Sequence, residues 1–253
     1  MKKLIVANWK MNPPTLLQAK KLFNSIKNWV DKNFNDLKTI EIVICPPFIY
    51  LESLSQFLRS KTYYSKPKLG AQNVFWEEEG AFTGEISPKM IKNLNVEYVI
   101  VGHSERRRIL KETDEIIANK LEAAIRHRLK PILCIGETEK ERKEGKTFKI
   151  LKNQLLEATK NLKTKTYNLK SIIIAYEPVW AIGTGNFCQP KEAQKVLLFL
   201  QKNVGEKKQI LYGGSVNSKN AKDYFKVGFD GLLVGGASLK EKEFLGIVKA
   251  FLL

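Results

Sequence analysis

The sequence predicts an α/β fold in which eight parallel strands and their outer helices form one closed (β/α)8 barrel. Eight short apolar runs recur along 253 residues, and segments with helical spacing lie between them. The mean interval of about 32 residues is that of one βα unit in such a barrel. Strands that alternate with helices are parallel and are joined by right-handed crossovers.

The expected strands are Leu4–Ala7, Ile40–Cys45, Lys68–Gln72, Tyr98–Gly102, Pro131–Ile135, Ile172–Glu177, Gln209–Gly213 and Gly231–Gly235. The clearest helical segments are Leu16–Asn33, Asp114–Arg128, Phe148–Lys160 and Lys191–Asn203. An open doubly wound sheet is the alternative, but no glycine-rich dinucleotide fingerprint follows the first run. Because no linker or low-complexity stretch interrupts the pattern, we expect a single domain over residues 1–253.

Composition indicates a cytoplasmic globular protein without a membrane anchor. Apolar residues make up 43% of the chain, but no run approaches the roughly 20 residues that span a bilayer. The first apolar run, Leu4–Ala7, is too short for a signal peptide. The three cysteines, Cys45, Cys134 and Cys188, are odd in number and lack metal-ligand spacing. We therefore expect reduced thiols and no metal site.

The formal net charge of +17 raises the possibility of nucleic-acid binding. The lysines are scattered through every segment, however, and no basic arm or aromatic-rich RNA-binding motif occurs. We therefore expect no nucleic-acid partner. A positive field would attract a small phosphorylated substrate, although biased lysine usage in the host would explain the charge equally well.

The stretch Ile172–Gly185 contains the strongest catalytic signal. An apolar run ends at the carboxylate of Glu177, and Pro178 stops the strand because it cannot donate a ladder hydrogen bond. The apolar loop Val179–Ile182 then precedes Gly183, as in a lid that excludes water from a ligand. A lone Glu before Pro is more often a satisfied structural acid, but this arrangement predicts a base beneath a lid.

Polar residues follow two other predicted strands. Asn8 and Lys10 come after the first, where a compact cation and an amide can bind a phosphate or a developing oxyanion. His103, one of two histidines, follows the fourth, and Ser104 is able to cap a helix there. A helix N-terminus disfavours a positive imidazole, so His103 would act as a neutral hydrogen-bond donor. Taken singly, a strand-end lysine or a lone histidine is more often structural.

Two glycine pairs follow the last two predicted strands. They are Gly213-Gly214, next to Ser215, and Gly235-Gly236. Paired glycines let backbone N–H groups approach an anion, and barrels often bind phosphate with the loops after strands seven and eight. This signal predicts a phosphorylated substrate without specifying the reaction.

Five ordered strings of residues resemble the triosephosphate isomerase family along essentially the whole chain. They are Asn8-Trp9-Lys10-Met11-Asn12, the GAFTGE string at 80–85, the GHSERR string at 102–107, the stretch 172–185 and the YGGSV string at 212–216. The resemblance implies a single-domain TIM barrel and an aldose–ketose isomerase of glycolysis and gluconeogenesis. It would interconvert dihydroxyacetone phosphate and glyceraldehyde 3-phosphate without a cofactor.

The resemblance also implies roles for individual residues. Glu177 would be the catalytic base, while His103, Lys10 and Asn8 would stabilise the ene-diol(ate) oxygens. The lid residue Gly183 would join Ser215, Gly235 and Gly236 in binding the phosphate. Three supporting residues complete the set: Glu105 beside Lys10, Cys134 beneath Glu177, and Thr83 on a loop that reaches the partner's active site in a homodimer.

Two positions depart from the family pattern. Pro13-Pro14 follows Asn12 where many members have glycine, and Asn186 follows the lid where lysine is common.

Two other functions remain as alternatives. Another phosphosugar barrel enzyme, such as an aldolase, is the enzymatic alternative, but a Schiff-base aldolase would need a lysine within a mid-barrel strand. A basic binding module built on the barrel is the non-enzymatic one.

Overall fold

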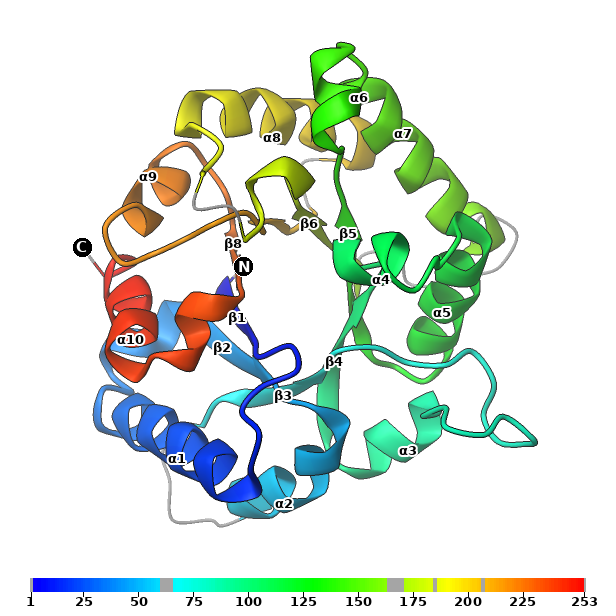
Figure 1. The fold of residues 1–253 in the computed structure, drawn as a ribbon. Helices are drawn as coiled ribbons and strands as arrows, with labels where there is room; N and C mark the ends of the chain where they lie inside the picture. Colours follow the sequence, from blue (N-terminus) through cyan, green and yellow to red (C-terminus); the bar gives the residue numbers. More distant parts are fainter. Residues whose placement is uncertain (1, 60–65, 163–170, 184–185, 206–207, 253) are drawn as a thin grey trace.

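In the computed structural model, the described residues form eight parallel strands that close into a barrel ringed by helices (Figure 1). The structure describes residues 2–59, 66–162, 171–183, 186–205 and 208–252. Each strand pairs with the next along the chain, and the last pairs with the first. The predicted (β/α)8 architecture is therefore confirmed, and the open sheet is excluded.

The strands are short and nearly all buried. They are β1 Lys3–Asn8, β2 Ile40–Cys45, β3 Lys68–Ala71, β4 Val96–Val101, β5 Lys130–Ile135, β6 Ile173–Tyr176, β7 Ile210–Tyr212 and β8 Gly231–Val234. β2 has the predicted bounds, and the ends of the other strands differ from the predicted ones by at most two residues. As a result Asn8 is the last residue of β1, whereas Glu177 lies just beyond β6.

The helices lie outside the barrel. They are α1 Leu16–Lys32, α2 Phe48–Arg59, α3 Pro88–Asn93, α4 Ser104–Arg108, α5 Asp114–Arg126, α6 Glu139–Lys143, α7 Thr147–Ala158, α8 Pro190–Val204, α9 Ala221–Lys226 and α10 Glu241–Lys249. The sequence analysis identified α1, α5, α7 and α8, in which apolar residues recur at helical spacing, but did not identify α2, which has 12 residues like α7. Helices of five or six residues, such as α4 and α6, span too few turns for that signal. No helix in the described ranges is long and apolar enough to cross a bilayer.

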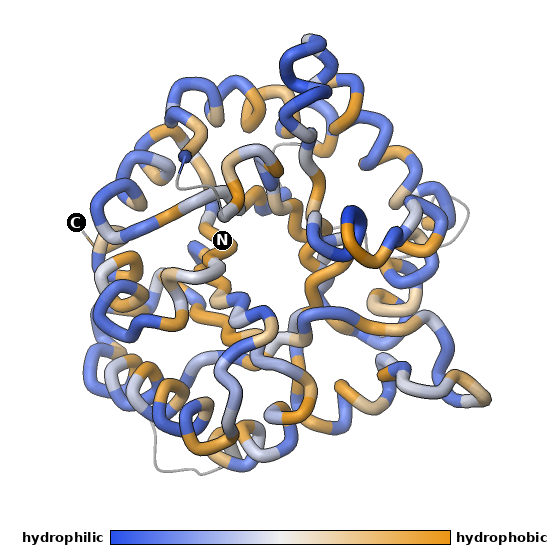
Figure 2. The backbone as a smooth tube through the Cα atoms, viewed as in Figure 1, coloured by the Kyte–Doolittle hydropathy of each residue, from blue (hydrophilic) through white to orange (hydrophobic). Residues whose placement is uncertain are grey.

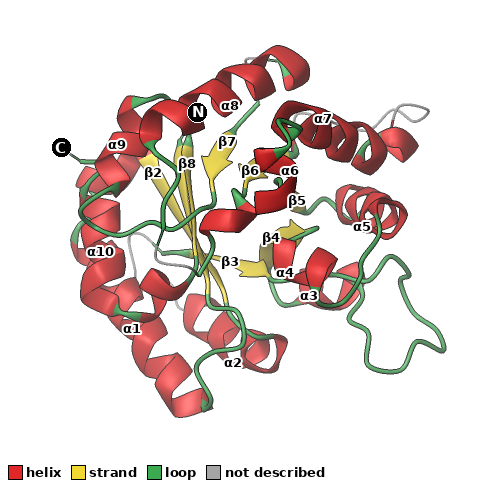
Figure 3. Cartoon of the chain, turned by 45° about the horizontal axis from the view of Figure 1, so that its top comes forward, coloured by secondary structure: helices red, strands yellow, loops and turns green. Residues whose placement is uncertain are grey.

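Alternate residues of each strand build two separate cores. Leu4 and Val6 point into the barrel, where they pack with residues such as Ile100 and Leu211. Residues of opposite parity, such as Ile5, pack outward with the apolar faces of the helices. Figure 2 shows this pattern along the chain, with apolar positions on the strands and on parts of the surrounding helices, and Figure 3 shows the helices around the strands from another side.

Closure of the barrel requires a very close approach between β8 and β1. A Cβ atom on Gly231 would lie 1.9 Å from the carbonyl oxygen of Leu4 and 2.8 Å from a methyl carbon of Leu211. The first contact is with backbone, which cannot rotate away as a side chain can. Glycine at this position therefore lets the last strand pair with the first.

We expect Gly231→Ala to lower the free energy of unfolding by about 1–3 kcal/mol, because the added methyl group overpacks the β8–β1 contact. Chemical denaturation of the purified variant measures this change. Gly236→Ala is the matched control, since nothing lies within 4 Å of a Cβ at Gly236. A Gly231→Ala protein as stable as this control would contradict the closure argument.

Candidate active site

A cavity of about 360 Å³ lies at the carboxyl ends of the strands, where a barrel of this type carries its active site. Its walls come from residues in the last part of β1 and β8 and from residues that follow β1, β4, β6, β7 and β8. They are Asn8, Lys10, His103, Glu177, Ile182, Gly183, Gly213, Gly214, Ser215, Val216, Leu233, Gly235, Gly236 and Ala237. All the residues that the sequence analysis assigned to catalysis or substrate binding line this one cavity.

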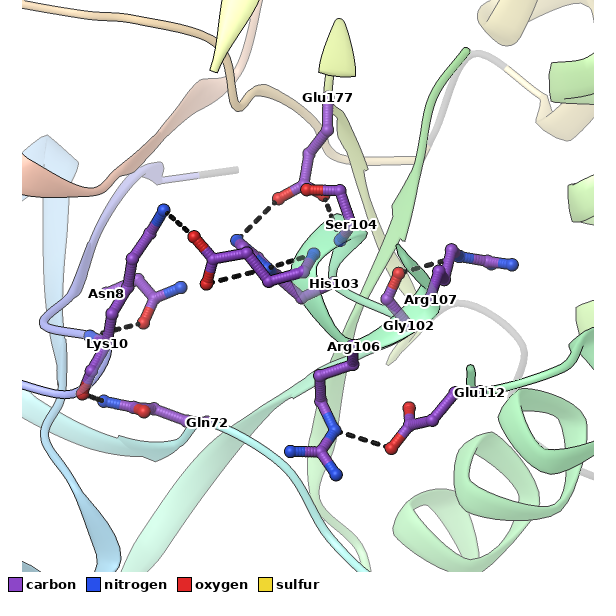
Figure 4. A network of polar contacts seen from close by, with 11 residues as sticks. Asn8, Lys10, Gln72, Gly102, His103, Ser104, Arg106, Arg107, Glu112 and Glu177 are labelled. Carbon is purple, nitrogen blue, oxygen red and sulfur yellow. Dashed lines mark hydrogen bonds and ion pairs between the residues drawn. The ribbon is translucent and has the colours of Figure 1, made fainter. Parts of the chain in front are cut away.

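Glu177 is held at the wall of this cavity by neighbouring strands. It is only 1% exposed, and its backbone amide donates a 2.8 Å hydrogen bond to Ile135 of β5. The amide of Ser104, at the start of α4, donates a 2.9 Å hydrogen bond to Oε2 of the carboxylate (Figure 4). Oε1 lies 3.1 Å from Nε2 of His103 but receives no well-aligned hydrogen bond. One oxygen is therefore anchored, and the other remains available in the cavity.

The hydrogen bonding of His103 defines its tautomer. The backbone N–H of Glu105 donates a 3.2 Å hydrogen bond to Nδ1, so this nitrogen acts as an acceptor and carries no proton. The remaining proton of a neutral imidazole is then on Nε2, the nitrogen that faces Glu177. His103 is also the N-cap of α4, where the helix dipole disfavours a positive charge. The geometry therefore favours a neutral imidazole that donates a proton or hydrogen bond from Nε2.

Lys10 extends from the loop after β1 into the same cavity. Its ammonium pairs with Glu105 at 2.5 Å, and its backbone N–H donates to Oδ1 of Asn8 at 3.0 Å (Figure 4). The φ angle of Lys10 is 53°, a left-handed conformation that is uncommon for lysine. Gln72 Nε2 stabilises it by donating 2.8 Å hydrogen bonds to the carbonyls of Lys10 and Cys45. The sequence analysis missed this function of Gln72, although Gln72 follows β3 at the same end of the barrel.

The two glycine pairs differ in what surrounds them. Cβ atoms on Gly213 and Gly214 would crowd Glu177 Cγ at 3.0 Å and the Tyr212 hydroxyl at 2.3 Å. In the second pair, a Cβ on Gly235 would lie 3.3 Å from Cε of Lys10, whereas nothing lies within 4 Å of a Cβ at Gly236. The first pair therefore allows close packing against Glu177 and Tyr212, Gly235 leaves room for Lys10, and only Gly236 faces open space.

Comparison with known proteins agrees with this geometry. A family model described as triosephosphate isomerase matches residues 3–251. Proteins named triosephosphate isomerase from Alkaliphilus oremlandii and Dictyoglomus thermophilum are each 44% identical over 98% of this chain and cover 98% and 99% of their own lengths. Another from Aquifex aeolicus is 44% identical over 99% of this chain and all of its own. The chain belongs to the triosephosphate isomerase family.

The apolar loop Val179–Ile182 borders one side of the cavity. Ile182 and Gly183 line the cavity, and Ser215 donates a 2.5 Å hydrogen bond to the carbonyl of Ala181. Thr184 and Gly185, which the sequence analysis included in the lid, lie outside the described residues. The loop that follows β7 thus holds the first part of the lid.

A buried carboxylate that the sequence analysis did not assign anchors the start of the lid. Trp180 Nε1 and the Tyr176 hydroxyl donate to Oε1 of Glu137 at 3.0 and 3.2 Å. Burial raises the pKa of Glu137, and these hydrogen bonds act in the opposite direction. The guanidinium of Arg142 lies 3.9 Å from the centre of the Trp180 ring. Because Glu137 lies 39 residues before Tyr176 and 43 residues before Trp180, no local pattern revealed these contacts.

The remaining predicted positions lie in different surroundings. Cys134 is fully buried inside the barrel, and Thr83 lies on an exposed loop that extends away from it between β3 and α3 (Figure 1). Pro13 accepts a 2.8 Å hydrogen bond from the Tyr50 hydroxyl, and its peptide bond with Asn12 is cis. Lys10, which precedes this pair, lines the cavity. Among the described residues, no group of His, Cys, Asp and Glu side chains forms a metal site.

We expect all three thiols to be unreactive in the folded protein. Cys45, Cys134 and Cys188 are buried, and burial raises the pKa of each thiol, to about 11 for Cys188. The Glu177 carboxylate raises the pKa of Cys134 further. At about pH 8, each thiol should react with Ellman's reagent at least about a hundredfold more slowly than after unfolding. A fast-reacting thiol in the folded protein would contradict this assignment.

Proposed function

We propose that this chain interconverts dihydroxyacetone phosphate and glyceraldehyde 3-phosphate, with Glu177 as the base. The observation that supports this proposal most directly is the contact between the Glu177 carboxylate and Nε2 of His103, at 3.1 Å, in a cavity that Lys10 also lines. A base, a neutral hydrogen-bond donor and a cation thus share one small space. These are the groups that proton transfer next to a carbonyl requires.

In the proposed reaction, Oε1 of Glu177 removes a proton from the carbon beside the substrate carbonyl. This oxygen is available because Ser104 occupies the other one and no aligned donor satisfies it. The protonated carboxylic acid then returns the proton to the neighbouring carbon, which converts ketose to aldose. The substrate carbonyl makes the proton removable, so the proposed steps use no metal or organic cofactor.

The developing negative charge on the two substrate oxygens would be stabilised by His103, Lys10 and Asn8. His103 donates from Nε2 and shuttles a proton between the oxygens, while the Lys10 ammonium supplies positive charge. The Asn8 side chain lines the same cavity and is held by the backbone of Lys10. Donors that are fixed before the reaction begins do not need to reorganise during it.

The phosphate group of the substrate would bind between the lid and the loops after β7 and β8. This side of the cavity is lined by Gly183, Ser215, Gly235 and Gly236. Glu177 is the one carboxylate among the described lining residues. Backbone N–H groups at such glycines bind phosphate without side-chain charge. With the phosphate held there, the apolar lid would keep water from the intermediate.

We expect Glu177→Gln to lower kcat by about 10²–10⁴-fold, because the amide cannot accept the proton that a general base removes. A coupled assay with glyceraldehyde 3-phosphate measures the loss. Glu139→Gln is the matched control, since Glu139 is an exposed glutamate on α6 that pairs with Lys143. Full activity of Glu177→Gln, with unchanged circular dichroism, would rule out Glu177 as the base.

We further infer that the chain acts as a single-domain, cytoplasmic homodimer that binds neither membranes nor nucleic acid. Pairing of β8 with β1 supports one domain over residues 1–253, and three buried free thiols fit a reducing compartment. The loop around Thr83 carries Phe82, which is 43% exposed, and Met11 after β1 is 94% exposed. Exposed apolar side chains on projecting loops are typical of surfaces that a second subunit covers.

We expect the wild-type chain to sediment at about twice its mass of 28.9 kDa. Phe82→Arg should weaken the dimer by at least about tenfold, because it places a charge in the inferred interface. Leu198→Arg on α8 is the matched control, since Leu198 is 59% exposed on a different part of the ring. Sedimentation equilibrium distinguishes the two, and a monomeric wild type, or equal dimerisation of both variants, would contradict the inferred interface.

A further inference from the structure

A second cavity of about 360 Å³ lies outside the barrel between α7 and α8, away from the catalytic groups. Its inner wall is formed by Ile172 and Ile174 at the start of β6, whereas Glu177 follows the other end of that strand. Leu155 of α7 and Val204 of α8 form its sides. The two helices are neighbours in the outer ring (Figure 1). The volume is within the range of about 300–1,000 Å³ that small-molecule sites occupy.

Two lysines are the charged residues of the described wall of this cavity. Lys208, between α8 and β7, is half-buried, and Lys152 of α7 lies at the exposed rim. No described residue forms an ion pair or a side-chain hydrogen bond with the Lys208 ammonium. Burial among apolar side chains lowers the pKa of Lys208 to about 8.

Comparison with another lysine shows why this arrangement is unusual. Lys120 is only 3% exposed, but its ammonium contacts Asn73 at 2.9 Å and Glu112 at 2.5 Å. A partly buried ammonium without a counterion is unfavourable, because it loses hydration and gains no electrostatic partner. Near neutral pH Lys208 still carries its proton, since its pKa lies above 7. An anion bound beside the Lys208 ammonium would replace the stabilisation by water that burial removes.

We propose that the cavity between α7 and α8 binds a small amphiphilic anion, whose apolar body packs on Ile172 and Ile174 and whose acidic head pairs with Lys208. The apolar inner wall selects for an aromatic or branched aliphatic body rather than a sugar. The two lysines and the absence of a carboxylate from the described lining select for a carboxylate or sulfonate head. This site is independent of the proposed catalytic reaction.

The proposal can be tested with a pair of fluorescent probes that differ in charge. 8-Anilinonaphthalene-1-sulfonate carries an acidic head, and N-phenyl-1-naphthylamine has the same ring system without it. Both are titrated into the full chain near neutral pH. We expect saturable binding of the anionic probe at one site per chain. Lys208→Met should weaken binding of the anionic probe by at least about tenfold, because it removes a charge-assisted contact but keeps an apolar stem.

The neutral probe and three further variants make the outcome decisive. Lys208→Met should change the affinity of the neutral probe by less than about twofold, and Lys208→Arg should retain most of the affinity for the anion. Thr159→Trp, at the rim of the cavity, should weaken both probes by obstructing it. Lys219→Met serves as a lysine control elsewhere, and retained isomerase activity shows that each variant is folded. Equal effects of Lys208→Met on both probes, or full binding by Thr159→Trp, would overturn the proposal.

Discussion

The arrangement of the active site depends on one buried carboxylate, that of Glu177, which groups from several strands hold in place. Its backbone amide bonds to Ile135, the Ser104 amide bonds to Oε2, and Gly213 packs against its side chain. A buried charge is costly unless it is hydrogen-bonded, so an oxygen without an aligned donor needs an explanation. That oxygen is the one that faces His103 and the cavity. Satisfying it would stabilise the carboxylate and make it a weaker base.

Fixed backbone positions, rather than long side-chain networks, bring the functional groups together. A Cβ on Gly136 would lie 1.7 Å from the carbonyl oxygen of Glu177, so only glycine lets the ends of β5 and β6 approach this closely. The left-handed conformation of Lys10 costs on the order of 1–3 kcal/mol, and such strain persists only where the surroundings determine it. The two hydrogen bonds from Gln72 supply that constraint. Gln72, which follows a strand of the closed barrel, therefore keeps Lys10 in a left-handed conformation that a flexible loop would leave.

The sequence predicted those features of the fold and the active site that leave a pattern among neighbouring residues. The strands and four of the longer helices were predicted because apolar periodicity repeats within each element. Glu177, His103 and Lys10 became candidates because each follows such a strand, but the resemblance of their surrounding strings to the triosephosphate isomerase family assigned their roles. In contrast, Gln72, Gly136 and Glu137 act through contacts between distant segments. Nothing in their immediate neighbours distinguishes them from an ordinary polar or turn residue.

The glycine pairs also depend on contacts between distant segments that the sequence did not predict. The sequence analysis treated Gly213-Gly214 and Gly235-Gly236 alike, as phosphate-binding turns. In the structure, Gly213 and Gly214 lie against Glu177 and Tyr212, Gly235 lies against Lys10, and only Gly236 faces open space. Which backbone atoms approach each other is a property of the whole barrel, because it depends on the register of strands that are far apart in sequence.

The charge of the cavity differs from that of the chain as a whole. The chain carries a formal +17, but Lys10 is paired with Glu105, and Glu177 adds a second carboxylate beside them. In the proposed reaction, the overall field would draw an anionic substrate toward the protein, whereas short-range backbone donors would hold its phosphate. A protonated His103 would offset the negative charge but would also pair with Glu177 and weaken the base. The amide of Glu105, which fixes Nδ1 as an acceptor, therefore keeps both His103 and Glu177 in the states that the reaction needs.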